Sequence, residues 1–290
     1  MRMFYWIAIT FLLIIPKGVM PAEGYQTAMF ADAVSYEHFM GRWSRLIAPL
    51  FVEFSRIRDG DRVLDVGSGT GALSEAIVTL RPSCRIIGVD PSAQYSSFAE
   101  SRKNSPNLKF EVGDAQKLAY PAAQFEVTTS LLVLNFIPDV SKAMAELRRV
   151  TRPGGTIAAA VWDYGEGMQM LRLFWDAAIA LDPSAERLDE KRMPLCRAGE
   201  LSRLFREAGL TDVQEQPLEV TLNFSSFEDY WNPFLEGQGP AGAYVAGLSE
   251  VKKSALKERL RTQLLKKSNP GGGFSLLARA WAVRGTVPNR

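Results

Sequence analysis

Apolar residues along this chain gather into short runs that alternate with stretches of helical periodicity. Short apolar runs bounded by turn residues predict buried strands, whereas apolar residues three and four positions apart predict amphipathic helices. The runs predict strands at residues 62–66, 85–89, 108–112, 125–130, 156–162 and 211–222. Helical patterns lie between them, after residue 72, over 138–150 and over 199–208. This alternation predicts an α/β fold with a mostly parallel sheet.

The stretch VLDVGSGTG, residues 63–71, joins the first predicted strand to the first helix. Gly67, Gly69 and Gly71 supply a turn in which the backbone approaches a ligand without obstruction by a Cβ atom. From Ala72 the apolar pattern becomes helical. A strand, a glycine turn and a helix N-terminus together predict a concave, hydrogen-bond-donating pocket at the carboxyl edge of the sheet.

Three aspartates near strand ends limit the class of ligand that this pocket can bind. The glycine turn alone also satisfies the G-x-G-x-x-G/A fingerprint of dinucleotide enzymes. Asp65, two positions before the first glycine, would repel a pyrophosphate and attract an ammonium group. Asp90 after the second strand suits the ribose of either cofactor, whereas Asp114 after the third strand lies within reach of an adenine amino group. Together they favour a cationic, non-phosphorylated adenosine.

Four motifs follow one another along the first part of the chain: VLDVGSGTG at 63–71, GVDPS at 88–92, GDAQKLAYP at 113–121 and ELRRVTRPGG at 146–155. In order and spacing the chain resembles class I S-adenosylmethionine-dependent methyltransferases of the type 11 branch, which includes quinone-biosynthesis C-methyltransferases. The resemblance covers about residues 61–162. It implies a Rossmann-like, seven-stranded, mostly parallel sheet with helices on both faces and an antiparallel last strand, expected at 274–284.

The resemblance also implies S-adenosyl-L-methionine as cofactor and assigns it nine contact residues. They are Asp65, Gly67, Ser68, Gly69, Asp90, Pro91, Asp114, Ala115 and Leu131. Asp65 and the first two glycines would hold the methionine part, Asp90 the ribose, and Asp114 with Ala115 the adenine. The expected reaction is methyl transfer to a small, apolar or aromatic acceptor.

Methyl transfer from a sulfonium is an in-line displacement that positioning of the reactants can accelerate. A general base is needed only when the acceptor must lose a proton. Many relatives carry histidines after the fourth strand, but here that segment is LNFIP at 134–138. The only histidine is His38, for which we expect no catalytic role. The candidate bases are therefore Tyr36, Asp163, a water held by Asn135, or a residue of a cap over the sheet edge.

The chain divides into a helical lid at 25–60, a cofactor-binding core at 61–163 and a C-terminal part at 164–290. Two insertions, 164–197 and 225–270, are expected to form a helical cap that holds the acceptor. The candidates for the inner surface of the lid, which would cover the cofactor, are Tyr36, Arg42 and Trp43. An aromatic cluster in the second insertion is expected to be mostly cap core, with one or two members in the acceptor pocket. Its members are Phe227, Tyr230, Trp231 and Phe234.

Residues 1–24 contain an apolar run at 4–15 that is typical of a signal peptide. Alternatively, translation begins at an internal methionine and the run is not part of the protein. The run is too short for a stable membrane span. We expect a cytoplasmic protein, because S-adenosylmethionine is made in the cytosol; export or tethering through 4–15 is the alternative.

Composition adds three exclusions. Lys and Arg number 34 against 32 Asp and Glu, so the chain lacks the basic field of a nucleic-acid binder. Cys84 and Cys196 fit no metal or redox spacing, so we expect buried, reduced thiols and no metal. Two other functions stay open: an NAD-dependent oxidoreductase, which leaves Asp114 unexplained, and an S-adenosylmethionine-binding protein without catalysis.

Overall fold

The computed structural model describes residues 32–266 and 272–289. Seven strands form one sheet in the order β3-β2-β1-β4-β5-β7-β6. They are β1 (Arg62–Val66), β2 (Arg85–Asp90), β3 (Leu108–Val112), β4 (Phe125–Leu131), β5 (Thr151–Trp162), β6 (Thr211–Phe224) and β7 (Phe274–Thr286). β1 to β5 run parallel, and β7 is antiparallel to both β5 and β6. The predicted fold class is confirmed.

Strand β5 begins five residues before the predicted start at Thr156. The Arg152–Gly155 segment continues the strand through an irregularity, after which Val127 of β4 pairs with Thr156. The amide of Gly154 donates to the carbonyl of Val287 at 2.8 Å, so this segment is also tied to the chain that follows β7. Sheet pairing, rather than the turn-forming residues, therefore decides the strand boundary.

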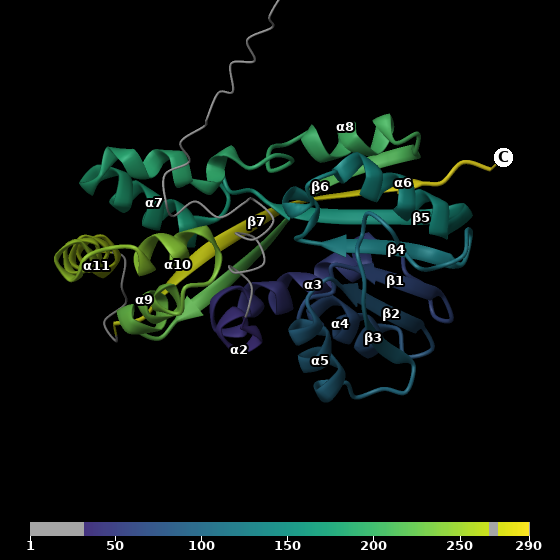
Figure 1. Ribbon diagram of the computed structural model, residues 1–290, viewed down its shortest axis with the longest axis horizontal. Helices are drawn as coiled ribbons and strands as arrows, with labels where there is room; N and C mark the ends of the chain where they lie inside the picture. Colours follow the sequence, from purple (N-terminus) through teal and green to yellow (C-terminus); the bar gives the residue numbers. More distant parts are fainter. Residues whose placement is uncertain (1–31, 267–271, 290) are drawn as a thin grey trace, which may run out of the picture.

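Helices cover both faces of the sheet, as predicted (Figure 1). On one face lie α3 (Arg42–Phe54), α4 (Ala72–Leu80) and α5 (Ala93–Arg102), and on the other lie α6 (Val140–Val150) and α8 (Glu200–Glu207). Strand β5 shows how the sheet serves two cores. Ala158, Ala160 and Trp162 belong to the first core, and the alternate residues Ile157 and Ala159 to the second. Side chains of a strand point alternately to opposite faces, so a strand that is apolar at every position can be buried on both.

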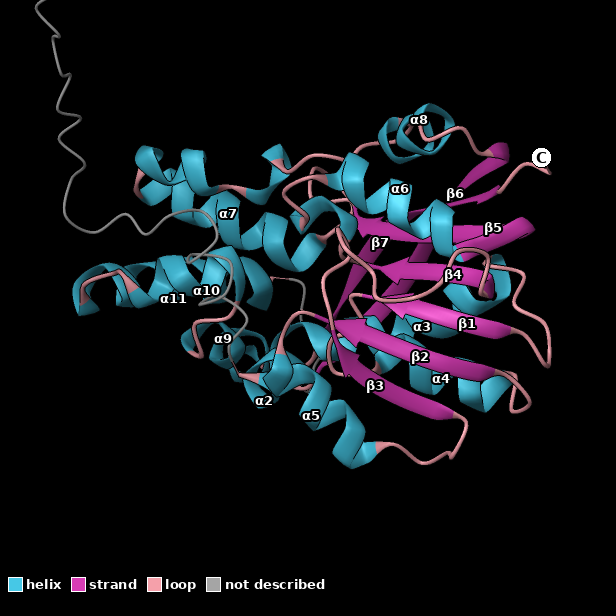
Figure 2. Cartoon of the chain, turned by 45° about the vertical axis from the view of Figure 1, so that its right-hand side comes forward, coloured by secondary structure: helices cyan, strands magenta, loops and turns pink. Residues whose placement is uncertain are grey.

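Both predicted insertions are helical and pack together as a cap. The cap elements are α7 (Gln169–Leu181), η3 (Pro183–Leu188), η4 (Glu190–Arg192), α9 (Phe227–Leu235), α10 (Gly239–Ala246) and α11 (Glu250–Leu265). The rings of Phe174 in α7 and Phe234 in α9 stack with centroids 4.6 Å apart. Figure 2 shows the arrowheads of β1, β2 and β4 pointing towards the cap helices, so the cap lies beyond the carboxyl edge of the sheet. Residues 267–270 of the second insertion lie outside the described residues.

The lid consists of α2 (Ala33–Tyr36), a π-helical turn η1 (Glu37–Gly41) and α3. The pattern of α3 predicts Leu50 in the buried stripe, but Leu50 is 43% exposed and Phe51 is buried in its place. The packed face is centred on Ile47 and Phe51, which leaves Leu50 at its rim. The predicted segment 1–24 and the first part of the lid segment, 25–31, lie outside the described residues.

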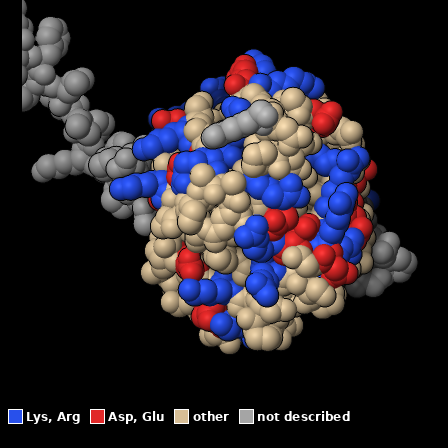
Figure 3. Space-filling view, turned by 90° about the vertical axis from the view of Figure 1, so that its right-hand side faces the viewer, with Lys and Arg blue, Asp and Glu red and all other residues tan. Residues whose placement is uncertain are grey.

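Surface charge is mixed on the end of the molecule opposite the cap. Figure 3 shows acidic side chains lying among the lysines and arginines on this face. Within residues 32–266 and 272–289, none of the helices combines the length and the apolar character that a membrane crossing requires. The apolar run at 4–15 falls outside that range.

Candidate functional site

A cavity of about 730 Å³ lies where the carboxyl edge of the sheet, the lid and the cap meet. Its size falls within the range of small-molecule sites. The lid contributes Tyr36, Phe39 and Met40 to its lining, and the cap contributes Leu171 and Glu190. Further walls come from the glycine loop, from the loops after β2, β3 and β4, and from Trp162 and Tyr164 at the end of β5.

The glycine loop after β1 requires glycine for conformational and steric reasons. Gly67 has φ of 74°, and a Cβ atom at this position would lie 2.5 Å from the Val133 side chain. The amides of Gly67 and Ser68 both donate to the carbonyl of Val89, at 2.7 and 3.1 Å, which ties the loop to β2. Gly71 also has positive φ, 95°, just before α4 begins. Only residues without a Cβ atom adopt these conformations without strain.

Asp65 at the end of β1 lines the cavity but is only 1% exposed. Its Oδ2 accepts a hydrogen bond from the Ser74 hydroxyl at 2.7 Å, whereas Oδ1 has no hydrogen-bond partner among the described residues. Burial raises the pKa of Asp65 to about 7, and the nearby carboxylate of Asp90 acts in the same direction. A buried carboxylate oxygen without a partner is costly, so this group is suited to a cationic ligand in the cavity.

Asp90 at the end of β2 is held in a fixed orientation by backbone amides. Its Oδ2 accepts from the amide of Gly69 at 2.9 Å, and its Oδ1 accepts from the amide of Ser92 at 2.8 Å. The residue is 8% exposed, and burial raises its pKa. Since each carboxylate oxygen accepts more than one hydrogen bond, Asp90 can also receive hydroxyl groups of a ligand.

Asp114 after β3 lies at the exposed rim of the same cavity, where its Oδ1 accepts from the amide of Gln116 at 2.8 Å. All nine residues that the sequence assigns to the cofactor line this one cavity. Their placement fits a ligand with a cationic group near Asp65 and hydroxyl groups near Asp90. Their contacts with the cofactor stay a prediction.

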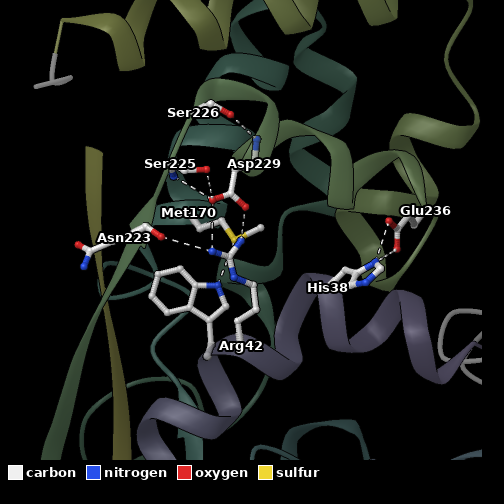
Figure 4. A network of polar contacts seen from close by, with 9 residues as sticks. His38, Arg42, Met170, Asn223, Ser225, Ser226, Asp229 and Glu236 are labelled. Carbon is white, nitrogen blue, oxygen red and sulfur yellow. Dashed lines mark hydrogen bonds and ion pairs between the residues drawn. The ribbon is translucent and has the colours of Figure 1, made fainter. Parts of the chain in front are cut away.

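Only one of the three lid candidates reaches the cavity. Tyr36 lines it, with its ring 5.4 Å from that of Tyr95 and its hydroxyl 3.4 Å from the Ser44 hydroxyl. Arg42 instead donates to Asp229 of α9 at 2.7 Å, and the indole nitrogen of Trp43 donates to the sulfur of Met170 at 3.3 Å. Figure 4 shows Arg42 pointing towards Asp229 of the cap.

His38 lies on the same outer side of the lid, where its Nδ1 is 3.2 Å from the carboxylate of Glu236 (Figure 4). Its side chain is largely exposed, and it does not line the cavity. On the inner side, Glu37 accepts a hydrogen bond from Thr70 of the glycine loop and pairs with Arg45 at 2.8 Å. The lid is thus joined to the cap on one side and to the glycine loop on the other.

Two of the candidate bases lie away from the cavity. Asp163 is paired with Arg279 at 2.6 Å, and the Asn135 side-chain amide donates to the sulfur of Met193 at 3.4 Å; neither lines the cavity. Cys84 and Cys196 are buried and free, as predicted. Among the described residues, no group of acidic, histidine and cysteine side chains is arranged to hold a metal ion.

The aromatic cluster of the second insertion belongs entirely to the cap core. Phe227, Tyr230, Trp231 and Phe234 are all buried, and none lines the cavity, so the expectation of one or two pocket residues is wrong. The rings pack on one another and on the ends of β6 and β7. Tyr230, for example, lies 5.7 Å from Phe224, centroid to centroid. The long strands β6 and β7 extend into the cap, where their side chains pack against the aromatic residues.

Glu190 is a cavity residue that the sequence did not reveal. It belongs to the short turn η4, is 4% exposed, and accepts a hydrogen bond from the indole nitrogen of Trp175 on its Oε2. Burial raises its pKa to about 8, and the adjacent Asp189 contributes to that increase. The surrounding sequence ERLDEKR, residues 186–192, is typical of an exposed, charged loop. No local pattern indicates that one of these carboxylates is buried.

Comparison with known proteins finds matches for the part of the chain that contains the nine predicted cofactor residues. Residues 64–159 match the sequence family described as "Methyltransferase domain". Among curated proteins, an uncharacterized methyltransferase of Schizosaccharomyces pombe is 32% identical over 110 residues, which cover 35% of this chain and 40% of that protein. A demethylmenaquinone methyltransferase of Deinococcus radiodurans is 35% identical over 98 residues, covering 33% and 41%. The chain spans about half the length of the curated relatives it matches.

A solved structure is similar over a longer stretch. A phosphoethanolamine N-methyltransferase of Haemonchus contortus, in complex with S-adenosyl-L-methionine, superimposes with a TM-score of 0.58 and covers 95% of this chain and 62% of that one. Its sequence identity is 17%, so the likeness concerns the fold.

Proposed function

We propose that the protein transfers a methyl group from S-adenosylmethionine to a small, apolar acceptor, because residues 64–159 match the methyltransferase domain family. The observation that carries the proposal is the arrangement of Asp65 and Asp90 in the cavity. One offers an unpaired, buried carboxylate oxygen and the other a carboxylate fixed by two amides. A cationic amino acid joined to a ribose has complementary groups for both.

Each part of the cofactor has a complementary group in the cavity. Asp65 would bind the amino group of the methionine part, Asp90 the ribose hydroxyls, and Asp114 with Ala115 the adenine. Bound S-adenosylmethionine supplies an electrophilic methyl group on a positively charged sulfur. Leu131 and Val133, at the end of β4, form an apolar wall beside the glycine loop.

The protein's own contribution is to align the reactants and exclude water. The lid and cap cover the carboxyl edge of the sheet, and Phe39, Met40, Trp162 and Leu171 line the cavity with apolar surface. Alignment of two reactants in such a cavity replaces a bimolecular encounter, for which effective molarities of about 10⁵ to 10⁸ M are known. An apolar wall also favours an acceptor of the same character.

The electrostatics of the cavity disfavour an NAD-dependent oxidoreductase. Among the described residues that line it there are four carboxyl groups, on Asp65, Asp90, Asp114 and Glu190, and no lysine, arginine or histidine. A dinucleotide would bring two phosphate charges into this environment without a cation to compensate them. A sulfonium and an ammonium group are favoured by the same carboxyl groups, because a nearby cation stabilises the ionised form of a carboxyl group.

Calorimetry with the full chain tests the proposal. We expect binding of S-adenosylmethionine and S-adenosylhomocysteine and none of NAD. Incubation with methyl-labelled cofactor and host extract should then label a small apolar product, which a binding protein without catalysis would not do. An Asp176→Asn variant, altered at an exposed position of α7, serves as the matched control. Absence of binding to both adenosyl compounds would refute the proposal.

We further propose that the reaction is cytoplasmic, since the cytosol supplies the cofactor, and that the acceptor is the protein's small-molecule partner. N-terminal sequencing of the protein from its native cell tests the location. A start at an internal methionine supports it, cleavage near residue 24 indicates export, and a retained start at residue 1 favours tethering through residues 4–15.

A further inference from the structure

The cap end of the cavity contains a carboxyl group that cofactor binding leaves unexplained. Glu190 lines the cavity from the first insertion, whereas the other three lining carboxyl groups follow strands β1, β2 and β3. The Trp175 indole donates to its Oε2, and no donor among the described residues reaches its Oε1. Because Glu190 lines the cavity, this oxygen is available to accept a hydrogen bond from a ligand there.

The cations near Glu190 are engaged elsewhere. Arg172 of α7 pairs with the adjacent Asp189 at 2.6 Å, and Lys191 lies 3.5 Å from the same carboxylate. The other titratable groups that affect Glu190 or are affected by it are Tyr164 and Cys196, and burial raises the pKa of both, so they are neutral near pH 7. Among the described residues, Glu190 therefore forms no ion pair of its own, and Arg172 acts on it only as a nearby charge.

Building on the proposed methyl transfer, we propose that Glu190 binds the acceptor and takes up its proton, and that this acceptor is a neutral, apolar molecule with a phenolic hydroxyl. In the step, the bond from sulfur to the methyl carbon breaks and a bond from that carbon to the acceptor's oxygen or ring carbon forms. The acceptor's proton passes to the Glu190 carboxylate and later to solvent. Charge balances, since the sulfonium becomes a neutral thioether and the carboxylate a neutral acid.

Three observations select this acceptor class. The lining contains no cation among the described residues, so an acceptor with a phosphate or carboxylate would lack a partner. The same cavity is lined by Trp162 and Leu171, which suit an apolar ring. A phenol has a pKa of about 10, within about two units of the elevated pKa of Glu190, so proton transfer between them is accessible. A neutral amine attacks with its free electron pair and needs no base beforehand.

The test compares two probes that differ in one proton donor. The affinity of 2-naphthol and of 2-methoxynaphthalene is measured by fluorescence for the full-length protein loaded with S-adenosylhomocysteine. We expect the wild type to prefer 2-naphthol at least about tenfold, as for a hydrogen bond to a charged group. That preference should increase between pH 6.5 and 8.5, because the carboxylate form of Glu190 becomes populated. The Glu190→Gln variant keeps an acceptor for the Trp175 indole and should lose both the preference and its pH dependence.

The outcomes separate this inference from the proposed function. Glu186→Gln, a change at an exposed residue of the same segment, should behave as the wild type. If the wild type does not bind S-adenosylhomocysteine, the proposed function fails. If it binds but does not distinguish the two probes, or if Glu190→Gln retains the preference, the role of Glu190 is overturned and the proposed function stands. Because the wild-type preference needs no variant, the inference is tested even if Glu190→Gln fails to fold.

Discussion

The two ends of the cavity are built in different ways. At the strand end, Asp65 and Asp90 are held by the Ser74 hydroxyl and by amides of Gly69 and Ser92, all within a short stretch of chain. At the cap end, Glu190 accepts a hydrogen bond from the Trp175 indole of α7 and lies next to the ion pair of Asp189 with Arg172. The strand end is a local, polar structure that would hold the proposed cofactor. The cap end combines lid, first-insertion and second-insertion residues, and under the proposed function it faces the acceptor.

The largest effect is expected for a substitution in the aromatic cluster of the cap, which should affect stability rather than cofactor binding. Phe234→Ala removes a fully buried ring that stacks on Phe174, and should lower the free energy of unfolding by about 3–5 kcal/mol. Denaturant unfolding measures the loss. Affinity for S-adenosylmethionine at a temperature where the variant is folded should change little, because Phe234 does not line the cavity. A large loss of affinity with little loss of stability would place the ring in the site instead.

A smaller effect is expected at the strand end for Asp65→Asn. The substitution removes the charge that faces the ligand's ammonium group while keeping an acceptor for Ser74, and should cost about 2–4 kcal/mol of binding free energy for S-adenosylmethionine. Calorimetry measures the change, with Asp176→Asn as control. Unchanged affinity would show that the unpaired oxygen of Asp65 does not meet the cofactor.

Asp90 and Asp114 offer a comparison within the strand end. Asp90→Ala should weaken cofactor binding by about 1.5–3 kcal/mol, since it removes charge-assisted hydrogen bonds in a buried place. Asp114→Ala should cost less, about 0.5–1.5 kcal/mol, because water competes at the exposed rim. Dissociation constants of the two variants under one set of conditions decide the order. The reverse order would mean that the adenine end contributes more than the ribose.

The last prediction concerns the free energy of unfolding, which should change gradually with pH. Burial raises the pKa of Asp65 to about 7 in the folded protein, whereas the unfolded value is 3.8. Stability from the neutral form is therefore complete below pH 3.8 and is lost as pH rises to 7, by about 1.4 kcal/mol per pH unit. Thermal unfolding of the ligand-free protein between pH 5 and 7.5 measures the loss. Asp65→Asn should reduce this slope, and an identical slope in the variant would contradict the assignment.

Much of the strand end was predictable because its determinants are contiguous. The stretch from Val63 to Gly71 specifies a strand, a turn with positive φ and a helix start through local conformational preference. Since the carboxyl ends of parallel strands meet at one edge, the positions of Asp65, Asp90 and Asp114 after successive strands suffice to predict that they share a site. The structure places all of them around one cavity.

The sequence was less informative about which side a helical residue faces. Tyr36, Arg42 and Trp43 all lie in the lid, yet only Tyr36 lines the cavity, because Arg42 finds a carboxylate on α9 and Trp43 packs against Met170. These partners are distant along the chain, separated from the lid by the whole cofactor-binding core. Helical periodicity gives relative direction around an axis and does not specify the neighbouring element.

The sequence by itself therefore determined the order of strands and helices, the glycine loop and the acidic edge of the sheet, since these depend on local preference and on the period of apolar residues. Only the tertiary structure decided that Glu190 is buried in the cavity and that the cap's aromatic residues are not. The physical reason is that burial of a side chain depends on elements that meet it from elsewhere in the chain. In the cap those elements belong to two insertions that lie far apart in the sequence, and local sequence preferences do not determine how they pack together.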